Sequence, residues 1–67
     1  MRHWLIDIIQ KKHLTHSIIA KNAKITRSYF TQIVSGRRRP SPDVAKRIAA
    51  VLGFANEWYK LLDDKKH

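Results

Sequence analysis

The sequence predicts an all-α fold, a compact bundle of five short helices. Apolar residues recur at spacings of three and four along most of the chain, which is the period of an amphipathic helix. Hydroxyl side chains and glycines stand where these periodic segments begin and end. No stretch alternates polar and apolar residues over the length of a strand, and no internal repeat is present. We therefore expect the 67 residues to form one domain, 1–67, without a sheet.

The first two helices are predicted in the N-terminal third of the chain. Apolar residues between Trp4 and Ile9 recur at helical spacing, and the cations at 11–13 suit the carbonyl end of the helix dipole. Thr15 offers a hydroxyl cap to a second segment, which carries apolar side chains on one side and stops at residues 22–24. The second helix is therefore only about two turns long.

The third helix is predicted directly after Thr26, whose hydroxyl can cap it. Phe30 and Ile33 lie three residues apart on one face, and Gly36 supplies a permissive residue at the C-terminal end. This arrangement leaves a polar set facing outward: Arg27, Ser28, Thr31 and Gln32.

The fourth helix has the clearest start in the sequence. In residues 41–43 a serine caps, a proline occupies the first turn and an aspartate complements the dipole. Gly53 ends this helix, and Asn56 is expected to cap a last helix that runs to Leu62. The tail at 63–67 is expected to fray.

The charge of the chain predicts a polyanionic partner. Lys plus Arg number 14 and Asp plus Glu number 5, which gives a formal net charge of +9. A membrane partner would require a basic helix with a spare apolar face or a run of about 18 apolar residues, and neither is present. The absence of cysteine excludes disulfides, cysteine zinc fingers and thiol catalysis. Without a secretory signal pattern, we expect a cytoplasmic, nucleoid-associated protein that binds nucleic acid.

Two short helices joined by a tight turn, the second one polar on its outer face, make a helix-turn-helix. In these residues the sequence resembles the Cro/C1-type (XRE-like) helix-turn-helix family of phage repressors and bacterial transcriptional regulators. The resemblance is carried by residues 14–21, 25–33 and 36–41, continues through 52–54 and Trp58, and covers roughly 14–62. It is specific because core positions, caps and a basic loop occur in the right order. It implies a lambda repressor-like DNA-binding domain.

The resemblance also implies which residues contact DNA. Side chains at the start of the third helix would read base edges in the major groove, and the candidates are Arg27, Ser28, Tyr29 and Gln32. Their chemistry agrees, because arginine can donate two hydrogen bonds to guanine and glutamine can pair with adenine. A second group would grip the phosphate backbone and so position the protein: Thr15, His16, Thr31, Ser35, Arg37, Arg38 and Arg39.

The sequence departs from the family pattern at two places. Many members have glycine in the turn where this chain has Lys24, so this residue is expected to adopt a left-handed conformation at a cost of about 1 kcal/mol. Members also often pair a glutamate at the position of Val34 with an arginine at the position of Ile9. Replacing a buried ion pair with apolar residues is commonly neutral or stabilising, so we expect Ile9 and Val34 to pack together.

The function implied by the resemblance is a transcriptional regulator, specifically a repressor of bacterial, phage or mobile-element genes. Its partner would be double-stranded operator DNA of palindromic sequence, bound by a homodimer that forms at least on DNA. The alternative is an antitoxin or another protein-interaction module whose DNA binding is autoregulatory. No enzyme is expected, because the sequence has no clustered carboxylates, no nucleophile with a base and no phosphate-binding glycine loop.

Several remaining side chains have two interpretations. His13 and His16 have the spacing of metal ligands, but without cysteines or clustered carboxylates they are interpreted as surface or phosphate-facing residues. No metal, cofactor or small-molecule ligand is therefore expected. Ile18, if exposed, would serve a partner. A C-terminal apolar set fits either the core or a dimer contact: Trp58, Tyr59 and Leu62.

Overall fold

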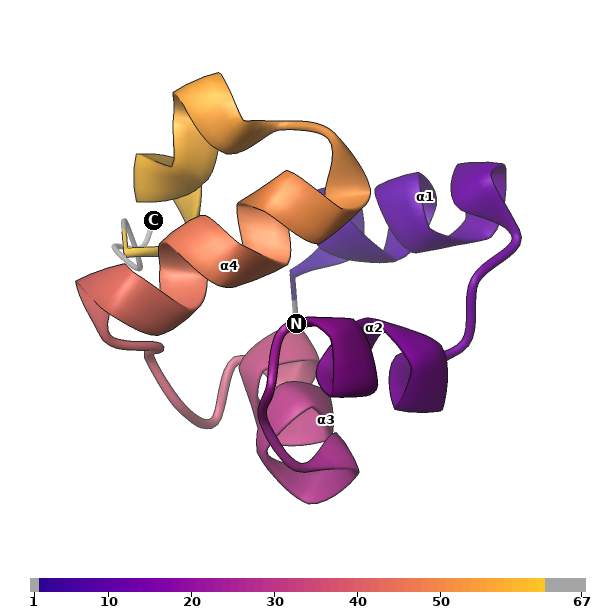
Figure 1. The fold of residues 1–67 in the computed structure, drawn as a ribbon, viewed down its shortest axis with the longest axis horizontal. Coiled ribbons are helices and arrows are strands. Elements are labelled where there is room, and N and C mark those ends of the chain that lie inside the picture. The colour runs from indigo at the N-terminus through magenta and orange to yellow at the C-terminus, as the bar shows by residue number, and fades with distance from the viewer. Residues whose placement is uncertain (1, 63–67) are drawn as a thin grey trace.

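A computed structural model describes residues 2–62, and Figure 1 shows their arrangement. These residues form four α-helices and one 3₁₀ helix, with no strand among them. In chain order the elements are α1 (His3–Lys12), α2 (His16–Asn22), α3 (Arg27–Ser35), α4 (Pro42–Leu52) and the 3₁₀ helix η1 (Ala55–Leu61). The predicted all-α fold is confirmed.

Three of the helices begin at the hydroxyl caps that the sequence predicts. The side-chain oxygens of Thr15, Thr26 and Ser41 each accept a hydrogen bond from the backbone N–H three residues further on, at 3.2, 3.0 and 3.3 Å. Each cap satisfies a donor that has no partner within its helix, and such a cap stabilises a helix by about 1 kcal/mol. The starts of α2, α3 and α4 are therefore encoded locally.

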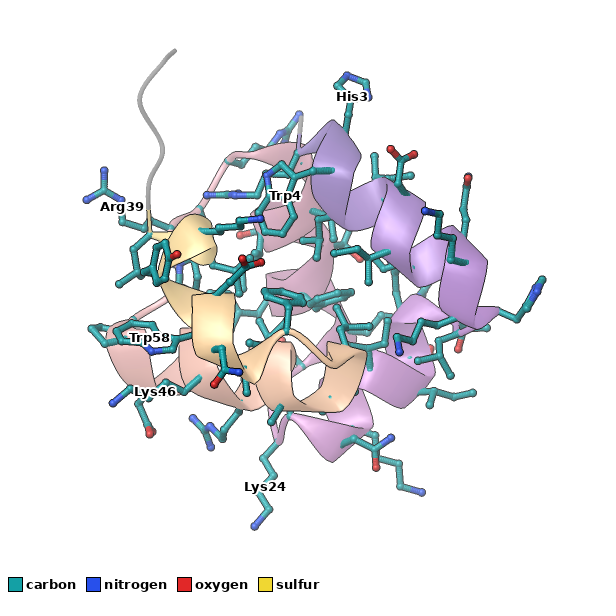
Figure 2. All side chains as sticks on the ribbon, turned by 90° about the horizontal axis from the view of Figure 1, so that it is seen from above. His3, Trp4, Lys24, Arg39, Lys46 and Trp58 are labelled. Carbon is teal, nitrogen blue, oxygen red and sulfur yellow. The ribbon has the colours of Figure 1, made fainter. Side chains whose placement is uncertain are left out.

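All four α-helices end in the same way. A left-handed residue follows the helix, and the backbone N–H of the next residue donates a hydrogen bond to the carbonyl of the residue five positions before it. The left-handed residues are His13, Lys24, Gly36 and Gly53, with φ of 56°, 61°, 86° and 85°. The hydrogen bonds behind them measure 3.4, 2.9, 2.9 and 2.9 Å. This is the hydrogen-bond pattern of a Schellman motif, which glycine adopts without strain and other residues do not. The left-handed conformation predicted for Lys24 is confirmed, and Figure 2 shows its side chain pointing outward.

A single hydrophobic cluster joins the helices. Helix α4 runs through the middle of the molecule and buries Ile48 completely, with other helices on either side (Figure 1). Ile9 of α1 and Val34 of α3 are both buried in this cluster, and their direct contact stays a prediction. Trp4 and Phe54 close its edge with their rings 5.6 Å apart in an edge-to-face arrangement.

The last helix differs from its prediction. It begins at Ala55, its capping position is Phe54 without a side-chain cap, and it is a 3₁₀ helix bent at Glu57, so the expected cap at Asn56 is wrong. Packing against α4 determines this segment: Leu61 is fully buried, and the Lys46 ammonium lies 4.9 Å from the centre of the Trp58 ring (Figure 2). Tertiary contacts thus override a local cap. The predicted frayed tail, 63–67, lies outside the described residues.

Candidate nucleic-acid interface

Helices α2 and α3 pack face to face, and this packing decides which side of α3 meets solvent. Ile19 of α2 and Phe30 and Ile33 of α3 are each completely buried in the common cluster. The turn between the two helices is held by the N–H of Ile25, which donates to the carbonyl of Ala20 at 2.9 Å. The opposite side of α3 forms the lower edge of the molecule in Figure 1. The packing of α3 on α2 therefore holds the polar side of α3 toward solvent.

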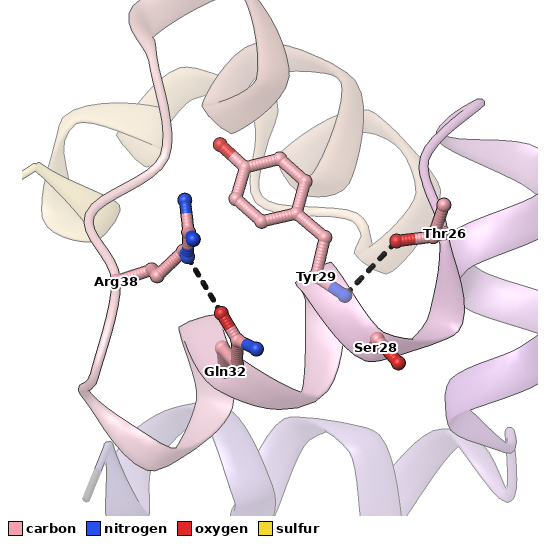
Figure 3. A pocket seen from close by; sticks show the side chains of 5 residues that line it. All are labelled: Thr26, Ser28, Tyr29, Gln32 and Arg38. Atoms are coloured by element: carbon pink, nitrogen blue, oxygen red, sulfur yellow. Dashed lines mark hydrogen bonds between the residues drawn. The ribbon is translucent and has the colours of Figure 1, made fainter.

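The four predicted base-reading residues differ in how far they are exposed on α3. Arg27 and Ser28 are exposed in its first turn, whereas Tyr29 and Gln32 are half-buried. An open depression of about 400 Å³ is shown in Figure 3, and its lining residues are Thr26, Ser28, Tyr29, Gln32 and Arg38. The structure therefore brings three of the four candidates into one depression, and Arg27 is not among the residues that line it.

Gln32 is joined to the arginine loop, residues 37–39, by several hydrogen bonds. The Nε of Arg38 donates to the side-chain oxygen Oε1 of Gln32 at 2.6 Å. The backbone N–H groups of Arg37 and Arg38 donate to the main-chain carbonyl of Gln32 at 2.9 and 3.3 Å. The hydroxyl of Ser35 donates to the same carbonyl at 3.0 Å. The start of the loop is thus fixed to the outward face of α3.

A second polar contact crosses from α2 to α3. The ring nitrogen Nδ1 of His16 lies 3.3 Å from the hydroxyl oxygen of Thr31, and the His16 ring meets Phe30 edge-on with centroids 5.3 Å apart. Thr15 stands one residue earlier, exposed, with its oxygen engaged in capping α2. Three of the predicted phosphate-contacting residues, Thr15, His16 and Thr31, therefore gather where α2 begins beside α3.

The three arginines of the loop are exposed, as expected for phosphate contacts. Arg37 and Arg38 are anchored to Gln32 through their backbones, whereas Figure 2 shows the Arg39 side chain extending outward at the edge of the molecule. The loop therefore places cations beside the depression and at the edge of the fold.

Arg2 is a structural residue that the sequence analysis did not identify. Its side chain is only 6% exposed, and its guanidinium donates to the carbonyl oxygens of Ile33, Arg38 and Leu61, the last two at 3.4 and 3.5 Å. Its backbone N–H donates to the carbonyl of Val34 at 3.0 Å. The side-chain partners lie 31 to 59 positions along the chain, so no local pattern separated this arginine from the surface cations. Arg2 ties the N-terminus to α3, the arginine loop and η1.

The described residues were also inspected for other kinds of site. Within 2–62 no group of three or more His, Cys, Asp or Glu side chains is placed to hold a metal ion. None of the helices described in this part of the chain is long and apolar enough to cross a membrane.

Two short helices joined by a tight turn, with a polar outer face on the second and an arginine loop beside it, define a DNA-binding protein of the helix-turn-helix class. Comparisons with known proteins agree with this class. Residues 10–57 match a family model described as a helix-turn-helix domain, so the chain belongs to the helix-turn-helix family.

A curated relative supports the same assignment. The chain is 41% identical over 64 residues to YqaF of Bacillus subtilis (strain 168), described as an uncharacterized HTH-type transcriptional regulator. The match covers 96% of this chain and 82% of the relative. No solved structure matches the chain significantly.

Proposed function

We propose that this protein is a sequence-specific transcriptional regulator of the Cro/C1 type that inserts α3 into the major groove of DNA. The observation that carries the proposal is the outward face of α3, where Arg27 and Ser28 are exposed in the first turn beside the depression that contains Gln32. The major groove is about 12 Å wide and admits one helix, so the first turns of α3 can reach base edges. The description of the relative as a transcriptional regulator supports this proposal.

In this proposal the remaining polar groups position the protein on the duplex. Thr15, His16 and Thr31 meet phosphates on one side of the groove, and Ser35 and the arginine loop meet them on the other. Phosphate contacts supply affinity that falls with salt, whereas base contacts supply the sequence preference. The excess of basic over acidic residues serves the first of these two roles.

We further propose that the protein is a repressor that binds a palindromic operator as a homodimer. Two copies of α3 would then enter half-sites roughly 34 Å apart, one helical turn of DNA. The proposed dimer contact is the C-terminal apolar set, Trp58, Tyr59 and Leu62, in which Tyr59 is 55% exposed. A footprint limited to one asymmetric half-site would contradict the dimer.

The proposal is tested by selecting sites from a random DNA library with the purified chain and titrating the best site at two salt concentrations. We expect a preference of about a thousandfold or more over scrambled duplex. Arg27→Ala should weaken binding to the selected site by roughly 1–3 kcal/mol, while scarcely changing the affinity for scrambled DNA. Lys11→Ala, which removes one exposed charge from α1, is the matched control and should leave the preference unchanged.

Equal affinity for every duplex would contradict the proposal. Such a result would leave a basic surface without base recognition. The function would then be sought in protein partners, for which the exposed Ile18 on α2 offers a contact.

A further inference from the structure

We infer that Arg38 is a specificity-determining residue, because it turns the acceptor oxygen of the Gln32 amide toward the arginine loop, so that the two side chains together present mainly hydrogen-bond donors and favour guanine. This inference rests on the proposed function, since it assumes that α3 reads the major groove. It changes the base that Gln32 is expected to read from adenine to guanine.

The orientation of the Gln32 amide follows from the chemistry of its partner. A guanidinium has donors and no acceptor, so only the oxygen of a carboxamide can bond to it. The 2.6 Å contact from Arg38 Nε therefore identifies the Gln32 atom that faces the loop as Oε1. Figure 3 shows the amide nitrogen on the side of Gln32 away from Arg38.

The position of Arg38 is itself fixed. Its backbone N–H donates to the main-chain carbonyl of Gln32 at 3.3 Å, so both its backbone and its side chain bond to the same residue. Its carbonyl accepts a hydrogen bond from Nη1 of the buried Arg2 at 3.4 Å. A chain of contacts thus runs from Arg2, through Arg38, to the amide of Gln32. The orientation of the amide is set before DNA arrives.

The hydrogen-bond donors of Gln32 and Arg38 determine which base fits. An unrestrained glutamine pairs with adenine by accepting from N6 through Oε1 and donating to N7 through the amide nitrogen. In this protein Arg38 occupies one lone pair of the Gln32 oxygen and turns this acceptor toward the loop, whereas the amide nitrogen and the remaining N–H groups of the guanidinium are donors. Guanine is the base that presents two acceptors, N7 and O6, in the major groove. The pair Gln32 and Arg38 therefore complements guanine.

The neighbouring side chains do not impose the same choice. The hydroxyl groups of Ser28 and Tyr29, which line the depression with Gln32, can each donate or accept. They adapt to whichever base is present, so the discrimination is assigned to the pair of Gln32 and Arg38.

The test compares base preferences among variants by library selection followed by titration against single-base substitutions. The base pair read by Gln32 is identified as the position whose preference is lost in Gln32→Ala. For the unaltered protein we expect guanine at this position. In Arg38→Ala the amide can rotate, and the ratio of affinities for adenine over guanine should rise tenfold or more, roughly the value of one good base contact.

Two further variants separate base selection from charge. Arg37→Ala removes the same charge from the same loop and leaves the Gln32–Arg38 contact in place, so it should weaken all duplexes alike and retain guanine. Gln32→Glu keeps an acceptor for Arg38 and has no donor, so it should lose the preference for guanine. Thermal unfolding of each variant verifies that it is folded.

The outcomes distinguish this inference from the proposed function. If the unaltered protein selects adenine opposite Gln32, or if Arg38→Ala weakens all sites equally and retains guanine, the inference is wrong and the regulator remains. If the unaltered protein shows no base preference at any position, the proposed function fails and the inference fails with it.

Discussion

The half of the molecule formed by α2, α3 and residues 36–41 differs from the half formed by α1, α4 and η1 in what its outer side chains contact. In the first half they form hydrogen bonds at the surface, such as Arg38 with Gln32 and His16 with Thr31. In the second half large aromatic side chains pack on other elements, as Trp58 does beneath Lys46. The proposed DNA contacts therefore lie in the first half, and much of the packing of large aromatic side chains lies in the second.

The largest effect is expected for a core substitution in the second half, formed by α1, α4 and η1. Ile48→Ala removes a completely buried side chain from α4 and should lower the free energy of unfolding by about 2–5 kcal/mol. Ile18→Ala makes the same chemical change on α2 at a side chain that is 46% exposed, and should change it by less than about 0.5 kcal/mol. Urea denaturation measures both. Equal effects would show that the hydrophobic cluster is not where the structure places it.

The next effect concerns Arg2, which connects the two halves. Arg2→Met keeps an apolar stem but leaves the carbonyl of Ile33 without its guanidinium donor, so the free energy of unfolding should fall by roughly 1–3 kcal/mol. Arg27→Met removes an exposed guanidinium and serves as the matched control, with little change in thermal unfolding. An Arg2→Met protein as stable as the control would mean that Arg2 does not join the halves.

The smallest effect compares two left-handed helix ends that both lie in the first half, at Lys24 and Gly36. Lys24→Gly relieves about 1–2 kcal/mol of backbone strain and loses about 0.5–1 kcal/mol to chain entropy, so a net gain of roughly 0.5 kcal/mol is expected. Gly36→Ala introduces the same strain at φ of 86° and should destabilise by about 1 kcal/mol. Opposite signs in thermal unfolding would support equivalent geometry at the two ends. A loss of stability in both variants would contradict it.

Sequence was sufficient wherever the determining interaction is local. The caps at Thr15, Thr26 and Ser41 are confirmed because a hydroxyl bonds to an N–H only three residues away. The ends at Gly36 and Gly53 are confirmed for the same reason, since a left-handed residue is a property of one position. The order and spacing of these signals gave the helix-turn-helix.

Sequence was insufficient where distant segments decide the outcome. Asn56 is a good cap in isolation, but η1 is shaped by its packing on α4 and begins at Ala55. The role of Arg2 depends on carbonyl groups far along the chain. The contact between Arg38 and Gln32 requires the loop to fold back over α3, which no helical spacing encodes. The assignment of individual residues to bases and phosphates stays a prediction.

The imbalance of 14 basic to 5 acidic residues gives added salt two opposite effects on this protein. Ions screen the repulsion among crowded like charges over about 10 Å at 0.1 M, so the folded chain should melt at a higher temperature as salt rises. The same ions compete with the protein for phosphates, so the complex with DNA weakens. A duplex relieves the repulsion in the way that dissolved anions do, and binding is linked to folding. The folded chain is therefore expected to be more stable when bound to DNA than when free.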